Sequence, residues 1–283
     1  MKKKVNHIDY SKASLPRTRR VQFGDCFKMN YLLILKCGLM LLLFFSPLIG
    51  FSIFADLYYV SLVSNSTEAI KETILIYDYL LNLGFILLSL VAIVGITGVI
   101  YVLRNFIWGE GIFFGSDFAR GIKQNAGKNT LFAVVFGVFY ALAFFVYSIF
   151  PDAIVSLLPL LLFILIFLPV FLWIILLNNF YESKWTSLVR NGLFFYVRNI
   201  GWSILGILML IFSIGWLFIP YELLLSIIPF EIAWLKYVIS VVGIVFLLPI
   251  TLLAVVLFST AKFDEYINKD NYLDYYLRGL NHD

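Results

Sequence analysis

The chain alternates between long apolar runs and short polar segments. Six runs of 19 to 29 residues contain no Asp, Glu, Lys or Arg: 37–55, 79–103, 129–151, 153–181, 199–221 and 237–261. Because about 20 apolar residues cross the hydrocarbon core of a bilayer as a helix, each run is long enough for one span. The pattern therefore predicts an all-α polytopic integral membrane protein with six transmembrane helices, at about 32–55, 79–103, 130–150, 156–178, 200–220 and 237–259.

The polar segments predict how the spans are grouped. Three outer loops would join the six spans into three hairpins: 56–78, a loop around Asp152, and 222–236. A basic arm at 1–29 precedes the bundle of 30–261, and an amphipathic tail at 262–283 follows it. Each ascending span begins with a basic residue close to an asparagine: Lys28-Met29-Asn30, Lys128-Asn129 and Arg198-Asn199. This shared start indicates either a drifted internal repeat or three independent interfacial anchors.

Short amphipathic helices are predicted in the segments on the side of the termini. In 116–128, Ser116 is suited to cap a helix, and Thr186 is suited to cap a second helix over 186–200. In the tail, apolar residues recur at i, i+3, i+4 and i+7: Leu273, Tyr276, Leu277 and Leu280. We expect these helices to lie in the membrane interface or to pack beneath the bundle. Docking of a cytoplasmic partner is the alternative.

The distribution of Lys and Arg predicts the orientation of the bundle. Nineteen of the 21 basic residues fall in four segments on one side: 1–36, 104–128, 182–198 and 262–283. The segments on the other side hold only Lys71 and Lys236. Because basic loops stay on the cytoplasmic side, both termini are predicted to be cytoplasmic. The predicted location is the cell (plasma) membrane, crossed six times.

Composition narrows the chemistry that the chain can perform. Apolar residues make up 62% of it and charged residues 13%, against about 25% charged in a soluble domain. The lipid bilayer is therefore the expected partner, and nucleic acid is not. The two histidines, His7 and His282, lie in the terminal tails, and Cys26 and Cys37 bracket the start of the first span. The sequence shows no set of metal ligands, no paired carboxylates and no base beside a nucleophile at a suitable spacing. We therefore expect no cofactor, no metal and no enzyme activity.

Residues inside the spans indicate which kinds of transport the protein could perform. The spans carry no charged residue at mid-depth, which disfavours a carrier driven by protons or sodium. Prolines inside the spans should kink them and free carbonyl groups: Pro47, Pro159, Pro169 and Pro249. Such kinks can shape a cavity, so carriage of an uncharged solute stays open. All the tryptophans lie near predicted span ends and are interpreted as interfacial anchors: Trp108, Trp173, Trp185, Trp202, Trp216 and Trp234.

One block of residues forms a specific signature. It runs from 99 to 131 and contains Arg104-Asn105-Phe106, Trp108-Gly109-Glu110-Gly111, Ser116-Asp117-Phe118, Lys123-Gln124-Asn125 and Lys128-Asn129. The block resembles the YesL-like family of small bacterial membrane proteins, with weaker matches at Gly24-Asp25 and 179–191. The resemblance implies a multi-span protein, often encoded beside carbohydrate-uptake and polysaccharide-degradation genes. It implies no catalytic or ligand residues, because the family has no established activity.

Two functions are compatible with these features. The first is a non-enzymatic accessory or regulatory component of carbohydrate uptake or utilisation that binds a membrane or cytoplasmic protein, plausibly a sugar-uptake system. The residues predicted to dock that partner are charged and lie in the cytoplasmic segments: Arg104, Asp117, Arg120, Lys123, Arg190 and Arg198. The alternative is a carrier or permease for an uncharged solute such as a sugar. The sequence leaves the oligomeric state open.

Overall fold

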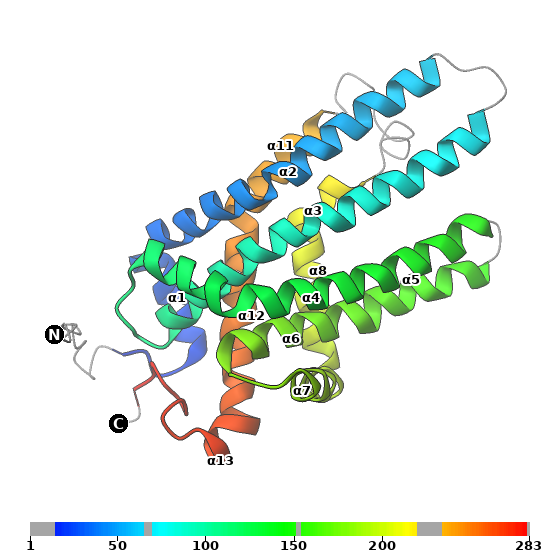
Figure 1. The fold of residues 1–283 in the computed structure, drawn as a ribbon. Helices are drawn as coiled ribbons and strands as arrows, with labels where there is room; N and C mark the ends of the chain where they lie inside the picture. Colours follow the sequence, from blue (N-terminus) through cyan, green and yellow to red (C-terminus); the bar gives the residue numbers. More distant parts are fainter. Residues whose placement is uncertain (1–14, 65–69, 151–153, 220–233, 282–283) are drawn as a thin grey trace.

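A computed structural model describes residues 15–64, 70–150, 154–219 and 234–281, and most of these are helical (Figure 1). No strand occurs in these ranges. Six of their helices are long and apolar enough to cross a membrane: Tyr31–Ser61, Tyr77–Ile107, Phe114–Ile149, Ile154–Phe180, Ile200–Phe218 and Leu235–Asn271. The predicted all-α fold with six spans is therefore confirmed. The first half of the predicted arm and the predicted loop around Asp152 lie outside the described residues.

The first hairpin is longer than its apolar runs predict. It consists of three helices: α1 (Arg19–Met29), α2 (Tyr31–Ser64) and α3 (Ile70–Ile107). The predicted loop at 56–78 is wrong, because α2 and α3 continue through most of it. The two helices still pack there: the Tyr77 hydroxyl donates a hydrogen bond of 2.6 Å to the Ala55 carbonyl, and the Tyr77 ring contacts that of Tyr58. A charged residue ends the apolar run without ending the helix.

The second hairpin starts with one continuous helix. Its elements are α4 (Phe114–Ile149), η2 (Ile154–Leu157), α5 (Leu158–Leu162), η3 (Phe163–Phe167) and α6 (Leu168–Phe180). A separate helix over 116–128 is wrong, because these residues are the first turns of α4. Ser116 does not cap it, since its hydroxyl donates to the Phe113 carbonyl at 3.0 Å. The Asp117 carboxylate instead accepts a hydrogen bond of 2.9 Å from the Phe113 N–H.

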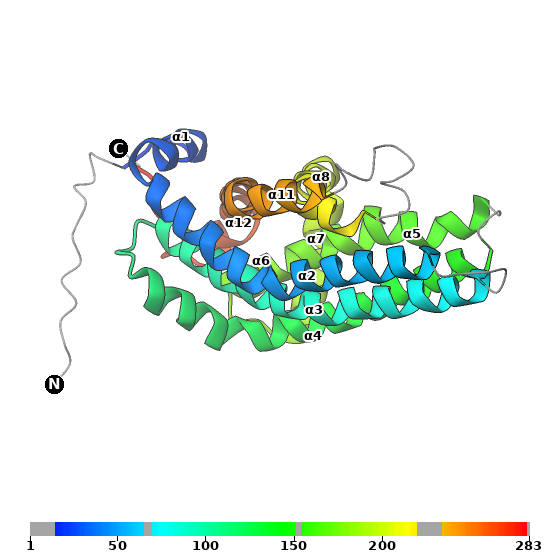
Figure 2. The same cartoon turned by 90° about the horizontal axis from the view of Figure 1, so that it is seen from above.

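The third hairpin follows an amphipathic helix. Its elements are α7 (Trp185–Arg198), α8 (Ile200–Ile214), η4 (Gly215–Phe218), α11 (Leu235–Val242), η5 (Gly243–Leu247), α12 (Leu248–Phe263), η6 (Asp264–Asn268) and α13 (Lys269–Asn271). The helix predicted at 186–200 is confirmed as α7, although Lys184 occupies its N-cap in place of Thr186. Figure 1 shows α7 end-on beneath α6, and Figure 2 shows α8 and α11 on one side of α2 and α3.

Two of the three asparagines at the span starts break the helix in the same way. Asn30 ends α1 with φ −134° and ψ 30°, and Asn199 ends α7 with φ −133° and ψ 41°. The span helix begins at the next residue in both cases. Asn129 lies inside the continuous helix α4 and makes no such break. The first and third lead-ins therefore share one geometry, and the second does not.

Two spans contain a wide π-helical turn just before a proline. Such a turn, η3, precedes Pro169 in span four, and another, η5, precedes Pro249 in span six. Each proline lacks the N–H that would bond the carbonyl four residues earlier. The Leu165 carbonyl accepts a hydrogen bond of 2.9 Å from the Tyr196 hydroxyl of α7. The Val245 carbonyl instead packs against α2 at a glycine, where a Cβ would overlap it.

The tail after span six is not the predicted helix. Residues 273–279 form successive turns, in which Leu277 and Gly279 have φ of 52° and 79°. Leu273 on the predicted apolar face is 75% exposed. The turns place the Gly279 backbone against the end of α3, where a Cβ would overlap the Ile107 carbonyl. Local spacing favours a helix, but this backbone contact requires conformations that a helix does not have.

The tail packs against other segments at one end of the bundle. The Arg278 guanidinium lies 2.8 Å from the Glu110 carboxylate, and Arg19 lies 3.0 Å from Asp264. We call this end the terminal end. It comprises α1, residues 108–113, the first turns of α4 and the tail at 272–281, which lie at the same end of the molecule in Figure 1.

The tryptophans do not all serve as anchors. Trp185, Trp202 and Trp234 are exposed on the surface of the described residues, which an interfacial anchor requires. Trp108 and Trp173 are 7% and 3% exposed, so the anchor interpretation is wrong for these two. Both lie inside the helix contacts, because α7 and the tail cover the span ends where they sit.

Candidate functional site

A network of buried side-chain amides joins α3, α4 and α6 near the terminal end. The Asn129 amide donates to the Thr97 hydroxyl at 2.9 Å and accepts from the Asn178 amide at 2.9 Å. Asn178 also donates to the Asn125 carbonyl at 3.1 Å, and the Asn125 amide donates to Asn179 at 3.2 Å. All five residues are at most 9% exposed. Because buried amides are costly unless bonded, this closed network fixes the three helices in one register.

Arg104 closes the network toward the terminal end. Its guanidinium donates to the Asn179 carbonyl at 2.5 Å and to the side-chain oxygen of Asn105 at 3.0 and 3.2 Å. It also lies 3.9 Å from the Tyr101 ring centroid and 4.7 Å from that of Trp108. Arg104 is therefore half-buried and fully engaged within the chain. It positions the ends of α3 and α6.

Trp108 and Asp264 connect this network to the tail and to α1. The Trp108 ring stacks on Tyr275 with centroids 4.9 Å apart. Asp264 binds Arg19 and accepts from the Asn268 amide at 2.8 Å, and Asn268 in turn accepts from the Tyr181 hydroxyl at 2.6 Å. Burial lowers the pKa of Arg19, and its hydrogen bond and charge interaction with Asp264 oppose that shift. The terminal end is thus one interlocked unit.

The six predicted docking residues divide into an inner and an outer group. Arg104 is held as described, and Asp117 is only 4% exposed. Docking needs exposed side chains, so neither is available as the prediction requires. The other four are exposed, in two separate places: Arg120 and Lys123 on α4, and Arg190 and Arg198 on α7.

The sequence analysis did not identify the buried amides, and it did not predict which face of α4 packs inward. Asp117, Gly121, Asn125 and Asn129 recur every four residues and form the inner face of this helix. Gly121 lies so close to Tyr101 that a Cβ would be 2.5 Å from the tyrosine Cβ. The spacing by four was the signal that could have identified an inner face. Arg120 and Lys123 are exposed, and the Arg120 guanidinium lies 3.9 Å from the carboxylate of Asp117.

A buried ion pair at the opposite end of the bundle was also missed. The Asp56 carboxylate of α2 binds the Lys236 ammonium group and the Tyr237 hydroxyl of α11. The Lys236 and Asp56 side chains are 1% and 12% exposed. Lys236 also donates to the Ile219 carbonyl at 3.3 Å. Each charge directly borders an apolar run in the sequence, and only the packing of α2 on α11 brings them together.

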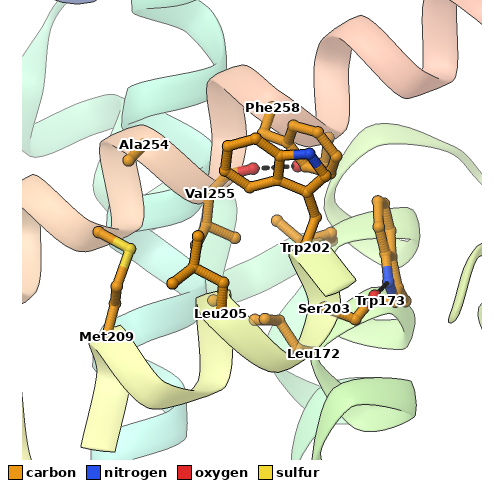
Figure 3. Close-up of a pocket in the computed structure, with 12 residues that line it drawn as sticks. Leu172, Trp173, Trp202, Ser203, Leu205, Met209, Ala254, Val255 and Phe258 are labelled. Carbon is orange, nitrogen blue, oxygen red and sulfur yellow. Dashed lines mark hydrogen bonds between the residues drawn. The ribbon is translucent and has the colours of Figure 1, made fainter. Parts of the chain in front are cut away.

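A groove lies between α6, α8 and α12 (Figure 3). Its volume is about 50 Å³. Its walls are mainly apolar, and the labelled residues include Trp202, Leu205 and Met209 of α8 and Val255 and Phe258 of α12. Binding sites for sugar-sized or larger ligands usually enclose about 300–1,000 Å³ with several convergent polar groups. This groove is smaller and less polar than such sites.

The amide network gives a direct stability test. We expect Asn178→Ala to lower the free energy of unfolding by about 1–3 kcal/mol, because the buried Asn129 oxygen and Asn125 carbonyl lose their donor. Asn271→Ala, at an exposed asparagine, should change it by at most about 0.5 kcal/mol. Thermal unfolding of the purified protein in detergent measures both. Equal effects of the two substitutions would contradict a stabilising network.

The buried thiols give a second test. Cys26 is 1% exposed, and burial, with a smaller contribution from the Asp25 charge, raises the pKa of its thiol to about 12. A free thiol ionises near pH 8.5, and only the thiolate reacts fast. At pH 8.5 we therefore expect N-ethylmaleimide to label Cys26 slowly in the folded protein and rapidly after denaturation. Mass spectrometry of the labelled peptide measures this, and fast labelling of the folded protein would contradict it.

Comparison of the chain with protein-family models, curated proteins and solved structures finds no match. Among the described residues, no three His, Cys, Asp or Glu side chains are grouped as metal ligands. The site is therefore interpreted from its own geometry: a rigid, interlocked terminal end that presents basic side chains on its outer surface.

Proposed function

We propose that this multi-pass protein is a non-enzymatic accessory or regulatory component of the cell membrane, whose terminal end faces the cytoplasm and docks a protein partner. The single observation that carries the proposal is the two-sided start of α4. Its inner face is locked into the amide network, and its outer face presents Arg120 and Lys123. A rigid surface of this kind suits binding, because little conformational freedom is lost when a partner docks.

The charge distribution supports the proposed orientation. Nineteen of 21 basic residues lie in the segments that lead to or from the terminal end. Helix α4 has 36 residues and a length of about 54 Å, which exceeds the roughly 30 Å of a hydrocarbon core. Its first turns can therefore extend beyond the bilayer while its remainder spans it. The basic outer face of α4 would then be in contact with the cytoplasm.

The resemblance to the YesL-like family supports a partner from carbohydrate uptake, such as a sugar-uptake system. We would place a photo-crosslinking amino acid at Ala119, beside Arg120, and irradiate native membranes. The expected result is one discrete crosslinked protein, and the same group at the exposed Leu142 near the far end of α4 should not produce it. Failure to recover a specific partner through Ala119 would remove the support for docking at α4.

Charge reversal tests which basic patch docks the partner. We expect Arg120→Glu with Lys123→Glu to lower crosslinking by about tenfold or more, because like charges across an interface are repulsive. The matched control reverses Arg190 and Arg198 on α7, and it should retain the crosslink. Membrane insertion and yield should not change in either double variant, since all four side chains are exposed. Unchanged crosslinking in the α4 variant would contradict the proposal.

The alternative is a carrier or permease for an uncharged solute such as a sugar. The wide turns before Pro169 and Pro249 favour it, because kinked spans can rearrange around a solute. The groove in Figure 3 does not favour it, since the polar side chains in its wall are already paired within the chain: Trp173, Ser203 and Ser259. Uptake of labelled sugar into liposomes that contain only this protein would establish the alternative.

A further inference from the structure

The groove between α8 and α12 leads to a cation at its terminal-end side. Trp202 stacks on Phe258 with ring centroids 4.7 Å apart. Lys262 lies one helical turn beyond Phe258, and residues four apart share one face of a helix. Its ammonium group lies 6.0 Å from the Phe258 ring and 5.7 Å from the Tyr266 ring. The apolar face of span six therefore ends in a positive charge.

A second cation lies at the same level. Arg198 is the exposed last residue of α7, and its guanidinium lies 5.6 Å from the Tyr266 ring. Arg198 and Lys262 therefore approach one aromatic ring from two different helices. The acidic group in contact with them is Glu265, whose carboxylate lies 2.7 Å from the Lys262 ammonium group. Two positive charges and one negative charge leave this place with a net charge of +1.

The walls of the groove suit a hydrocarbon chain. Trp202 is 56% exposed and Met209 is 36% exposed, so this surface of α8 faces the bilayer. The two residues are seven positions apart, which corresponds to about 10 Å along the helix. The Ser203 hydroxyl donates to the Asn199 carbonyl at 2.8 Å, and the Ser259 hydroxyl donates to that of Val255. Both hydroxyls are therefore bonded within their own helices, and an acyl chain in the groove would contact mainly apolar surface.

We propose that the groove and its two cations bind one molecule of an anionic phospholipid such as phosphatidylglycerol. One acyl chain lies between α8 and α12 against Trp202 (Figure 3), and the lipid phosphate contacts Arg198 and Lys262. Basic residues at the membrane surface attract anionic headgroups, and the groove fixes the position of the lipid beside them. Phosphatidylcholine has the same acyl chains and no net charge, so it binds more weakly.

The test is a lipid titration of the purified full chain in detergent, followed by native mass spectrometry. Phosphatidylglycerol and phosphatidylcholine with identical acyl chains are the two probes. The wild-type protein binds phosphatidylglycerol more tightly. The double variant Arg198→Gln, Lys262→Gln loses about tenfold or more in affinity for this lipid and keeps its affinity for phosphatidylcholine. The control Arg120→Gln, Lys123→Gln removes equal charge from α4 and keeps the wild-type preference.

A second pair of variants tests the groove itself. Ala254 lines the groove and is half-buried, and Ala254→Leu fills part of it. This variant binds both lipids more weakly, whereas Ala141→Leu, at a half-buried alanine of α4, binds them as the wild type does. Three results would overturn the proposal: equal wild-type affinity for the two lipids, equal losses in the two glutamine double variants, or unchanged lipid binding by Ala254→Leu. The first would indicate that the headgroup charge is not recognised, the second diffuse attraction by basic residues in general, and the third a lipid bound elsewhere.

Discussion

Gly38→Ala is expected to lower the free energy of unfolding by about 1–3 kcal/mol, although the same change usually favours a helix. Gly38 of α2 lies against the backbone of span six at η5, and an added Cβ would overlap the Val245 carbonyl oxygen. Backbone cannot rotate away as a side chain can, so the two helices must separate. Pro249, four residues after Val245, has no N–H with which to bond this carbonyl in the ordinary helical pattern.

The matched control for Gly38 is another glycine of the same helix. A Cβ at Gly50 would meet no atom within 4 Å, so Gly50→Ala should be neutral or stabilising by up to about 1 kcal/mol. Thermal unfolding in detergent, followed by a thiol-reactive dye that reports exposure of Cys26 and Cys37, measures both variants. Changes of the same sign and size would contradict the close contact between α2 and span six.

Lys236→Met is expected to destabilise the protein by about 3–5 kcal/mol, because it leaves the Asp56 carboxylate buried without its cation. The double variant Asp56→Asn, Lys236→Met removes both charges and should recover a large part of this loss. An ion pair on the surface behaves differently. Lys262→Met breaks the more exposed pair with Glu265 and should cost at most about 1 kcal/mol in detergent without added lipid.

The same unfolding assay gives the comparison. A large loss in Lys236→Met, partial recovery in the double variant and a small loss in Lys262→Met would together show that α2 and α11 are held by a buried charge pair. Lys236→Met as stable as the wild type would contradict it. Recovery also separates the charge from the shape of the side chain, because Lys236 is replaced by Met in both variants.

Several local predictions from the sequence were wrong. Ser116 and Thr186 were expected as caps, and the tail was expected as a helix, because each judgement used only neighbours in sequence. The carboxylate of Asp117 binds the start of α4 instead, and Gly279 docks on α3 in a conformation that no helix has. A contact with a distant segment outweighed the local preference in the tail, whereas at the start of α4 a neighbouring carboxylate took the place of the expected cap.

The predicted docking residues show most clearly what the sequence alone does not distinguish. Arg104, Asp117, Arg120 and Lys123 are all charged and lie in one polar stretch, so they were equivalent in the sequence. In the structure, the Asp117 side chain is buried while Arg120 is exposed, although their charged groups lie 3.9 Å apart, and Arg104 is enclosed by aromatic rings. Which face of α4 packs inward depends on α3 and α6, which supply Thr97 and Asn178 as partners.

The sequence by itself determined that six apolar helices are long enough to cross a membrane, because span length and hydrophobicity are properties of a continuous stretch of chain. Only the tertiary structure decided which polar groups face one another. Asp56 and Lys236 are 180 positions apart, and Gly38 and Val245 are 207 apart. Such pairs arise from the angles at which helices cross and from the places where prolines bend them. A local sequence pattern does not predict these angles and bends.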